Sequence, residues 1–432
     1  MTIVTEEFRG LYGIVTTSLG QPTLPAVYVP HPIVSVPHPQ MRGRAEPAMA
    51  AIVARSTGAA EPPLGSVPQT NGAPGTTGTV IERITVDDEP EAIFERFAAE
   101  NWTDGLPFVP PTEERVARML AFSDRDPASS LGPMPPRWGE ATIVKLAVNA
   151  VMAGCKPEYF PVIVTAVQAI LRKPFNLYGI QGTTNPATPV LIVNGPIARE
   201  IALNARGNLF GPGFRANATI GRAIRLIMTT IGGGVPQAAD KSTLGNPAKY
   251  TCCFAENEAD SPWAPLHVER GFEALTSTVT AFGGAAPANI IEKSKTAGDM
   301  LATIARAMAV SGSNNMFMSQ EALVVLGPEH AAIAAREDFD KEKVRQTLFE
   351  HARIPFELIG RSNADVLAVW RGGCIDERDG QRALRIVEKP EDIVIVVAGG
   401  AGNHSASIPG WYSRSVTLPI VRADGTPIRS IS

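Results

Sequence analysis

A glycine-rich segment near the end of the chain holds the residues best suited to proton transfer. It reads GGAGNHSASIPGW, from Gly399 to Trp411, and follows an apolar run that predicts a buried strand over Ile393–Ala398. Glycines at a strand exit let backbone amides approach an anion closely. His404 can change charge near neutral pH, so we predict it as a catalytic acid or base, with Ser405 binding substrate. A tight turn with His404 bonded to the backbone is the alternative, and the dinucleotide-binding fingerprint is not met.

A second segment, Thr251–His267, reads TCCFAENEADSPWAPLH and carries two carboxylates close to a histidine. Glu256 and Glu258 are separated by one residue, so their side chains share a face on a strand and can converge on a loop. With His267 they form a ligand set for a divalent metal ion, and Glu256 is also a candidate catalytic group. A solvated acidic turn is the alternative.

The same segment holds two of the four cysteines. No C-x-x-C pair exists, which excludes a zinc ribbon. We take Cys253 as a candidate nucleophile at a strand end, and its alternative is a small buried hydrophobic residue.

A basic stretch suits the recognition of an anion. It reads NLFGPGFRANATIGRAIR, from Asn208 to Arg225, and precedes a predicted helix over Ala218–Thr230. We expect Asn217 to cap that helix, and Arg215 and Arg222 to hold a carboxylate or phosphate beside its first turn. Lys241 follows in a polar loop and is a further candidate for substrate binding. Arginines on a solvated helix face are the alternative.

Two strand–Gly-Pro–helix units must position these segments. LIVNGPIAREIA begins at Leu191 and LVVLGPEHAAIA begins at Leu323, so the two align at a constant offset of 132 residues. Each reads as a short strand buried on both faces, followed by a proline in the first helical turn. Polar loops over 181–185 (QGTTN) and 311–315 (SGSNN) precede the two strands. We therefore predict an internally duplicated α/β fold with the site between two lobes.

The predicted domains are an N-terminal arm and linker (1–78), a first α/β lobe (79–275) and a second α/β lobe (276–432). Residues 24–39, LPAVYVPHPIVSVPHP, alternate apolar residues with prolines, which excludes a central strand and favours an extended arm. A helix is expected over 46–54, and 66–80 reads as a linker. The arm is too apolar for a solvated tail, so we expect it to pack on another subunit of a homo- or hetero-oligomer.

Bulk composition excludes several classes of protein. The 432 residues carry a formal net charge of −4, without the basic stripe that nucleic-acid binding requires. No apolar run is long enough for a membrane-spanning helix, and the acidic start MTIVTEEFRG differs from a secretory signal. Four scattered cysteines form no disulfide framework, so we expect a cytoplasmic protein.

Several motifs carry a resemblance to a known family. NWTDGLPFVPPTEERV, MAGCKPEYFPV, FGPGFRANATIGRAIRL, AENEADSPWAPLHVERGF and VVAGGAGNH together resemble poorly characterised bacterial proteins associated with the UGSC-like domain. The resemblance covers most of residues 81–420, and GQPTLPAVYVPHP is similar to the later part of that domain. The domain is named for a selenocysteine- or cysteine-containing motif near its start. This chain has no cysteine before Cys155, which puts a direct redox role in doubt.

The sequence favours an enzyme that acts on a small polar or anionic molecule by lyase- or hydrolase-like acid/base chemistry. The cofactor is unknown, and a divalent metal ion is the candidate. One alternative is a non-catalytic subunit of a hetero-oligomeric thiol or selenol redox enzyme whose partner carries the reactive cysteine. A binding protein without chemistry is the other alternative.

Overall fold

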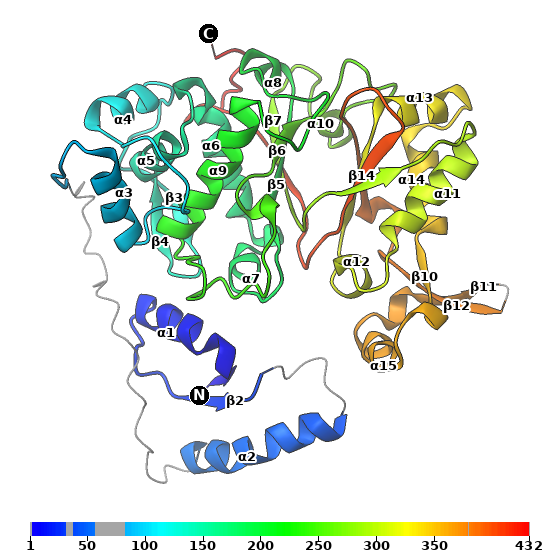
Figure 1. Ribbon diagram of the computed structural model, residues 1–432, viewed down its shortest axis with the longest axis horizontal. Coiled ribbons are helices and arrows are strands. Elements are labelled where there is room, and N and C mark those ends of the chain that lie inside the picture. The colour runs from blue at the N-terminus through cyan, green and yellow to red at the C-terminus, as the bar shows by residue number, and fades with distance from the viewer. Residues whose placement is uncertain (1, 32–37, 57–82, 379, 432) are drawn as a thin grey trace.

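Two four-stranded sheets form the centre of the molecule (Figure 1). The computed structural model describes residues 2–31, 38–56, 83–378 and 380–431. The first sheet has the order β15 (Val416–Pro419), β7 (Thr278–Gly284), β5 (Thr188–Asn194), β6 (Cys253–Ala255). The second has the order β13 (Ile393–Val397), β9 (Ala322–Leu326), β14 (His404–Ile408), β8 (Ala288–Ile291). The fold is therefore mixed α/β, as the sequence predicts.

The two sheets share one pattern of strand directions. In the first sheet β5 pairs parallel with β6 and antiparallel with β7, and β15 adds antiparallel to β7. In the second, β9 pairs parallel with β13 and antiparallel with β14, and β8 adds antiparallel to β14. In each sheet the carboxyl ends of the two parallel strands lie at one edge, which we call the carboxyl edge of that sheet.

Each sheet is completed by an edge strand that comes from the chain segment leaving the other sheet. β8 follows β7 in the chain and pairs with β14, whereas β15 follows β14 and pairs with β7. The two crossing segments meet where Gly284 bridges Gly410, with the Ala285 amide donating to the Pro409 carbonyl at 2.9 Å. Because β7 and β15 complete the first sheet, the division between the sheets does not follow the expected boundary at residue 275.

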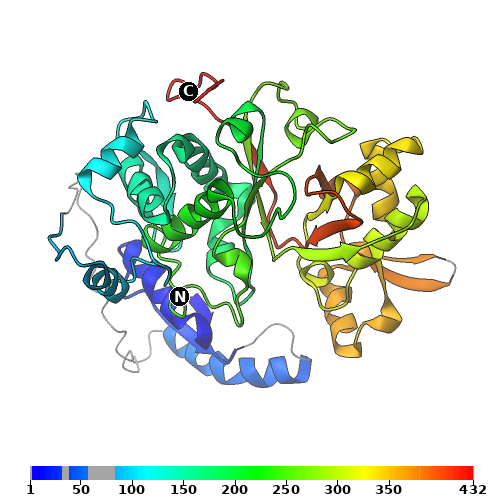
Figure 2. The same ribbon diagram turned by 45° about the horizontal axis from the view of Figure 1, so that its top comes forward.

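Side chains alternate along the strands and so define four layers. On β5, Leu191 and Val193 pack with helices α5 (Ile143–Ala153), α6 (Phe160–Ile170) and α9 (Arg215–Thr230), whereas Ile192 faces the second sheet. On β9, Val324 packs with helices α11 (Ala297–Met308) and α14 (Lys341–His351), and Val325 faces the first sheet. The result is helices, sheet, sheet, helices, as Figures 1 and 2 show. Burial of apolar side chains on both faces of each sheet is the main stabilising term of this arrangement.

Several helices begin or end at residues suited to capping. α5 stops at Gly154, whose φ of 86° is left-handed and suits glycine. Thr296 caps α11 by accepting from the Asp299 amide, and Asp340 caps α14 by accepting from the Lys343 amide. α9 starts three residues earlier than predicted, at Arg215. The other helices are α3 (Pro90–Ala99), α4 (Glu113–Leu120), α7 (Leu177–Gln181), α8 (Pro196–Glu200), α10 (Leu266–Glu269), α12 (Asn314–Phe317), α13 (Pro328–Arg336) and α15 (Arg361–Trp370).

The predicted strand–Gly-Pro–helix units are present as β5–α8 and β9–α13, and the offset of 132 matches their Gly-Pro helix starts but is one position out along the strands. The offset of 132 equates Val193 with Val325, and these side chains face different layers. The strand registers agree at an offset of 133 instead, because Val190 pairs with Phe282 while Leu323 pairs with Ile408, and all four face the space between the sheets. A shift of one residue turns every side chain to the other face of a strand.

Smaller elements complete the described residues. They are the hairpin of β3 (Ser130–Met134) and β4 (Gly139–Thr142), and a sheet of β10 (Arg353–Pro355), β12 (Gln381–Arg385) and β11 (Ile375–Arg378). Among the described residues, no helix combines the length and apolar character that crossing a membrane requires.

The N-terminal segment forms a small unit below the first lobe in Figure 1. β1 (Thr2–Thr5) pairs parallel with β2 (Ala26–Val29) across α1 (Arg9–Ser18), and α2 (His38–Ser56) follows. The predicted arm over 24–39 therefore contains a paired strand, while its residues 32–37 and the predicted linker over 66–80 lie outside the described residues. The unit touches the first lobe, because a Cβ built on Gly182 would lie 2.8 Å from the Leu11 side chain.

Candidate functional site

The carboxyl edge of the first sheet gathers the acidic residues that the sequence singles out. Asn194 is the last residue of β5, and Glu256 follows directly after β6. The Asn194 side-chain amide donates to Glu256 Oε2 at 2.8 Å and to Glu258 Oε1 at 3.1 Å. One amide group therefore holds the two carboxyl groups together, as predicted from their spacing.

Glu258 is held by backbone and side-chain donors. Its Oε1 accepts from the Gly195 amide at 2.6 Å, and its Oε2 lies 3.6 Å from an Arg199 guanidinium nitrogen. The side chain is 18% exposed, so water reaches part of the group. These contacts fix both oxygens of Glu258 beside Glu256.

Glu256 is the more buried of the pair, with 4% of its surface exposed. Burial raises the pKa of this carboxyl, and the charge of Lys341 with hydrogen bonds from Leu266 and Asn194 offsets only part of the rise. Its Oε1 has no hydrogen-bond partner among the described residues. Glu256 can therefore keep a proton at a pH where an exposed glutamate has lost its own.

His267 is fully buried beside Glu258. Its Nε2 lies 3.3 Å from the Ala274 carbonyl, which can only accept, so the hydrogen-bond network places the ring hydrogen on Nε2. Nδ1 is then an acceptor, 4.0 Å from Glu258 Oε1. Nδ1 joins Glu256 Oε1 and Asn194 Oδ1 as buried acceptors that meet no donor within the described part of the chain. A proton on Glu256 would supply a donor to this group of acceptors.

The predicted metal site is not found. Glu256, Glu258 and His267 do lie together, but no group of three or more His, Cys, Asp or Glu residues in the described ranges is arranged to hold a metal ion. Glu256 Oε1 and His267 Nδ1 have no hydrogen-bond donor among the described residues, but Glu258 Oε1 accepts from both Asn194 and Gly195. The lone pairs of that third candidate ligand are therefore taken by N–H donors, and the set of three is incomplete.

A cleft of 450 Å³ opens beside this acidic cluster. The first lobe contributes Arg206 and Asp260, and the lining from the second lobe consists of Pro328, Glu329, Ala332, Gly399, Gly400 and Ala401. Asp260 is joined to the cluster through Asn257, whose amide donates to Asp260 Oδ2 at 2.9 Å. Asp260 also pairs with Arg206 at 3.3 Å. The cleft therefore takes one wall from each lobe.

Close backbone contacts shape the cleft. The Gly399 amide donates to the Ala205 carbonyl at 2.8 Å, and a Cβ built on Gly400 would lie 2.8 Å from the Gly207 Cα. Asn217 holds the opposite side of this loop: its side chain accepts from the Asn204 amide at 2.8 Å and donates to the Asn204 carbonyl at 3.0 Å. The predicted role of Asn217 as a helix cap is wrong, because Phe214 occupies the capping position of α9. Asn217 instead supports the loop that carries Arg206.

His404 and Ser405 are not among the residues that line the cleft. His404 is exposed at the start of β14, with Nδ1 3.0 Å from the Asn289 side-chain oxygen. Ser405 is buried, and its hydroxyl accepts from the Gly327 amide at 3.1 Å and bonds to His330 Nδ1 at 2.7 Å. His330 in turn bonds to the Glu292 carbonyl. Ser405 therefore anchors the start of α13, and the cleft contacts only the glycines that precede these two residues.

The predicted anion clamp is not assembled. Arg222 makes a two-pronged ion pair with Asp104, at 2.7 and 2.8 Å, and both side chains are largely buried. Arg215 is exposed and donates to the Gly154 carbonyl at 3.0 Å. The guanidinium group that does line the cleft belongs to Arg206, in a loop where the sequence carries no recognisable binding motif.

Cys253 is not suited to be a nucleophile. It is buried in the helix-facing core, and burial raises its thiol pKa well above the usual value. Burial also raises the pKa of Cys155 and of Cys252 to about 12. A protonated, inaccessible thiol is a poor nucleophile, so the alternative of small buried hydrophobic residues holds for this pair.

Lys241 lies at the opposite edge of the first sheet, in the loop that leads to β6, and is half-buried. The sequence-based candidates thus divide into three places: the acidic cluster, the glycine loop of the cleft, and the amino edge of the first sheet. Asn194, Arg199 and Arg206 belong to the site and were missed. Only Asn194 left a signal, as a polar residue ending an otherwise apolar strand.

Comparisons with known proteins give no relative: no family model and no curated protein matches the chain.

Proposed function

We propose that the chain is an enzyme that acts on a small polar, anionic molecule by acid/base chemistry at the carboxyl edge of the first sheet. One observation carries the proposal. Glu256 is a buried carboxyl with a raised pKa, held beside the more exposed Glu258 and close to a cleft that neither side chain lines. A buried carboxyl with a raised pKa is a usual candidate for the acid of such a site.

Each residue then has a distinct role. Glu256 in its protonated form donates a proton, and Glu258, held in place by Gly195 and Arg199, accepts one. His267 offers Nδ1 as an acceptor beside Glu258. In the cleft, Arg206 supplies positive charge for an anionic substrate group, which would exchange with Asp260. The reaction class is lyase- or hydrolase-like.

The same proposal includes an internal duplication. Its support is the shared strand order of the two sheets and their reciprocal exchange of the fourth strand. The polar loops before β5 and β9 also meet, through paired side-chain amides of Asn185 and Asn314 at 2.7 and 3.1 Å. Two copies that trade a strand in this way would face each other across the cleft.

The test is a comparison of matched glutamate variants. Wild type, Glu256→Gln and Glu357→Gln are each incubated with a panel of small carboxylic acids and phosphate esters, and turnover is followed by proton NMR. Glu357 is exposed and far from the edge, so its variant controls for the loss of a surface carboxylate. We expect turnover of at least one compound, reduced by about 100-fold or more in Glu256→Gln and unchanged in Glu357→Gln. Full turnover by a folded Glu256→Gln protein would refute the acid role.

A second candidate is a subunit of a hetero-oligomeric thiol or selenol enzyme. It is favoured by the cysteines, which are all buried and free, and by the small two-stranded sheet of β1 and β2, a form that is marginally stable on its own. Under this reading the N-terminal unit binds a companion that carries the reactive group, consistent with the resemblance to UGSC-associated proteins and a cytoplasmic location. A stable, monodisperse homo-oligomer from expression of this chain alone, active without a partner, would count against it.

A further inference from the structure

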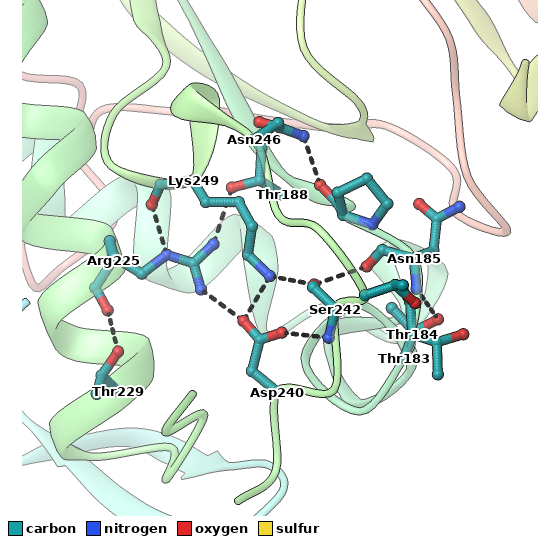
Figure 3. Close-up of polar contacts among 12 residues, drawn as sticks. Thr183, Thr184, Asn185, Thr188, Arg225, Thr229, Asp240, Ser242, Asn246 and Lys249 are labelled. Atoms are coloured by element: carbon teal, nitrogen blue, oxygen red, sulfur yellow. Dashed lines mark hydrogen bonds and ion pairs between the residues drawn. The ribbon is translucent and has the colours of Figure 1, made fainter. Parts of the chain in front are cut away.

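A second cluster with chemistry of its own lies at the amino edge of the first sheet, opposite the acidic cluster (Figure 3). Lys249 precedes β6, and its ammonium group lies 2.5 Å from the Ser242 hydroxyl. The same ammonium pairs with the Asp240 carboxylate, and the Ser242 amide donates to that carboxylate at 3.1 Å. A hydroxyl, an amine and a carboxylate thus form a connected series within one loop.

We infer that Ser242 is the nucleophile of a second site, with Lys249 as its base and Asp240 as the residue that orients the lysine. A nucleophile within hydrogen-bond reach of a base, and a base held by a third group, is the arrangement that activates a serine for acyl transfer. The site is separate from the proposed acid/base centre and uses none of its residues.

Burial makes Lys249 a workable base. Its side chain is 14% exposed, and burial lowers its pKa. The Asp240 charge opposes this, while the neighbouring positive charge of Arg225 lowers the pKa further. Arg225 is fixed in place, because its Nε donates to the Lys249 carbonyl at 2.7 Å and another of its nitrogens donates to the Thr188 hydroxyl at 3.0 Å. Because Arg225 cannot move away, its positive charge continues to disfavour the charged form of Lys249 and so favours the neutral amine.

Ser242 is presented to solvent on one side and held on the other. Its hydroxyl donates to the Asn185 carbonyl at 3.0 Å in the resting state, in which Lys249 is charged. The residue is partly exposed, so the loop that carries the hydroxyl borders solvent.

The step that follows is balanced with water as the only co-reactant. The Ser242 oxygen attacks an acyl carbon, its proton passes to the neutral Lys249 amine, and the bond to the leaving group breaks as Lys249 returns that proton to it. Water then hydrolyses the acyl-serine. With Lys249 neutral for this step, Arg225 and Lys241 still outweigh Asp240 in charge, so the favoured substrates are esters or amides that carry a carboxylate or phosphate group.

The test uses an alkyl fluorophosphonate, which reacts with activated serines, on the full chain, with the modified residue located by mass spectrometry. We expect labelling at Ser242 and none in Ser242→Ala. Lys249→Arg keeps the ion pair with Asp240 but cannot act as a base, so it should lower the labelling rate about 100-fold or more with little change in Tm. The wild-type rate should rise with pH as Lys249 loses its proton.

Two controls separate this inference from other outcomes. Ser362 is an exposed serine on α15 and gives the background rate. Glu357→Gln, an exposed substitution in the second lobe, should label as fast as wild type. The inference is overturned if Ser242 reacts no faster than Ser362, or if Lys249→Arg labels at the wild-type rate, which would make Lys249 a structural ion-pair partner only.

Discussion

The carboxyl edges of the two sheets have the same backbone frame and opposite chemistry. Matched by strand register, Glu256 corresponds to Ala398, and their amides make equivalent bonds, to the Val193 carbonyl at 3.3 Å and to the Leu326 carbonyl at 3.0 Å. Asn194, which holds the carboxylates of the first edge, corresponds to Gly327 in the second.

The shared backbone therefore fixes the positions of the side chains, and the residue types at those positions determine their chemistry. The first edge collects carboxyl groups with dedicated donors, and the second edge collects glycines that let the first lobe approach closely. One edge offers proton transfer and the other forms a wall of the cleft. A site between the lobes needs both contributions: carboxyl groups from the first lobe and a closely approaching backbone from the second.

The largest expected effect on stability comes from placing a carboxyl group at the carboxyl edge of the second sheet. Ala398 is 3% exposed and packs between the sheets, and Gly327 has no side chain to hold a carboxylate there. We expect Ala398→Glu to lower the free energy of unfolding by about 3 kcal/mol or more, measured by urea denaturation, because it buries an unpaired carboxyl. Ala401→Glu, exposed in the same loop, should change it by about 0.5 kcal/mol or less. Similar losses in both variants would mean that the two edges do not differ in this way.

The point where the two sheets exchange strands gives the second effect. A Cβ on Gly410 would lie 1.8 Å from the Glu321 carbonyl oxygen, a backbone atom that cannot move aside easily. We expect Gly410→Ala to lower the free energy of unfolding by about 2 kcal/mol or more. Gly298→Ala, exposed on α11 with open space around its Cβ, should leave stability unchanged or raise it slightly. A harmless Gly410→Ala would show that the crossing is looser than described.

A third prediction sets Glu256 against Glu292, which follows β8 at the carboxyl edge of the second sheet. Burial raises the pKa of Glu256, so its ionisation in the unfolded chain makes the wild type lose stability as pH rises through the usual carboxyl range and up to the raised pKa. Glu256→Gln cannot ionise, so its unfolding free energy relative to wild type should increase over that range.

Glu292 should behave in the opposite sense. Burial would raise its pKa, but hydrogen bonds from Ser294 and Thr303 outweigh burial and lower the pKa to about 2. Its stabilising contribution is therefore complete above the usual carboxyl pKa and is lost as pH falls toward 2. Glu292→Gln should be less stable than wild type at neutral pH, and the difference should vanish in strong acid. Denaturation curves at several pH values check both carboxyls, and slopes of the same sign would contradict the contrast.

The smallest effect on stability is expected at the cleft. Arg206 and Asp260 form an exposed ion pair, so Arg206→Ala should change the free energy of unfolding by about 0.5 kcal/mol or less. Binding of an anionic ligand identified in the turnover panel should nevertheless weaken by about tenfold, as measured by calorimetry, because a charged hydrogen bond is lost. Arg96→Ala, which removes an exposed pair with Glu100 far from the cleft, should leave that binding unchanged.

Local sequence patterns predicted individual helices and strands better than they predicted how these elements pair and pack. The apolar runs at Ile393–Val397 and Ala322–Leu326 and the stop at Gly154 were readable, because burial on two faces and left-handed backbone leave a mark in the sequence. The sequence did not predict the exchange of β8 and β15, because the exchange depends on which strand of which sheet each of them pairs with. The one-residue error in aligning the two units has the same origin, since both units carry apolar residues on both faces.

The site was predicted only where its residues are neighbours in the chain. Glu256 and Glu258 were found from their spacing, but Asn194 reaches them across the sheet, and the partner of Arg222 is Asp104, distant in sequence. The burial that protonates Glu256 comes from the packing of two sheets. Solvent exposure of His404 and burial of Ser405 were likewise set by the pairing of β14 with β8.

The central claim is that Glu256 keeps its proton where an ordinary glutamate loses it. The most direct measurement is a pH titration of the glutamate side-chain carbons by NMR on carbon-13-labelled wild type, with Glu256→Gln to assign the signal. The account predicts one glutamate resonance that titrates well above the others and is absent from the variant. If all glutamates titrate in the ordinary range and the variant removes one of these, the acidic cluster is a structural contact and the proposed acid does not exist.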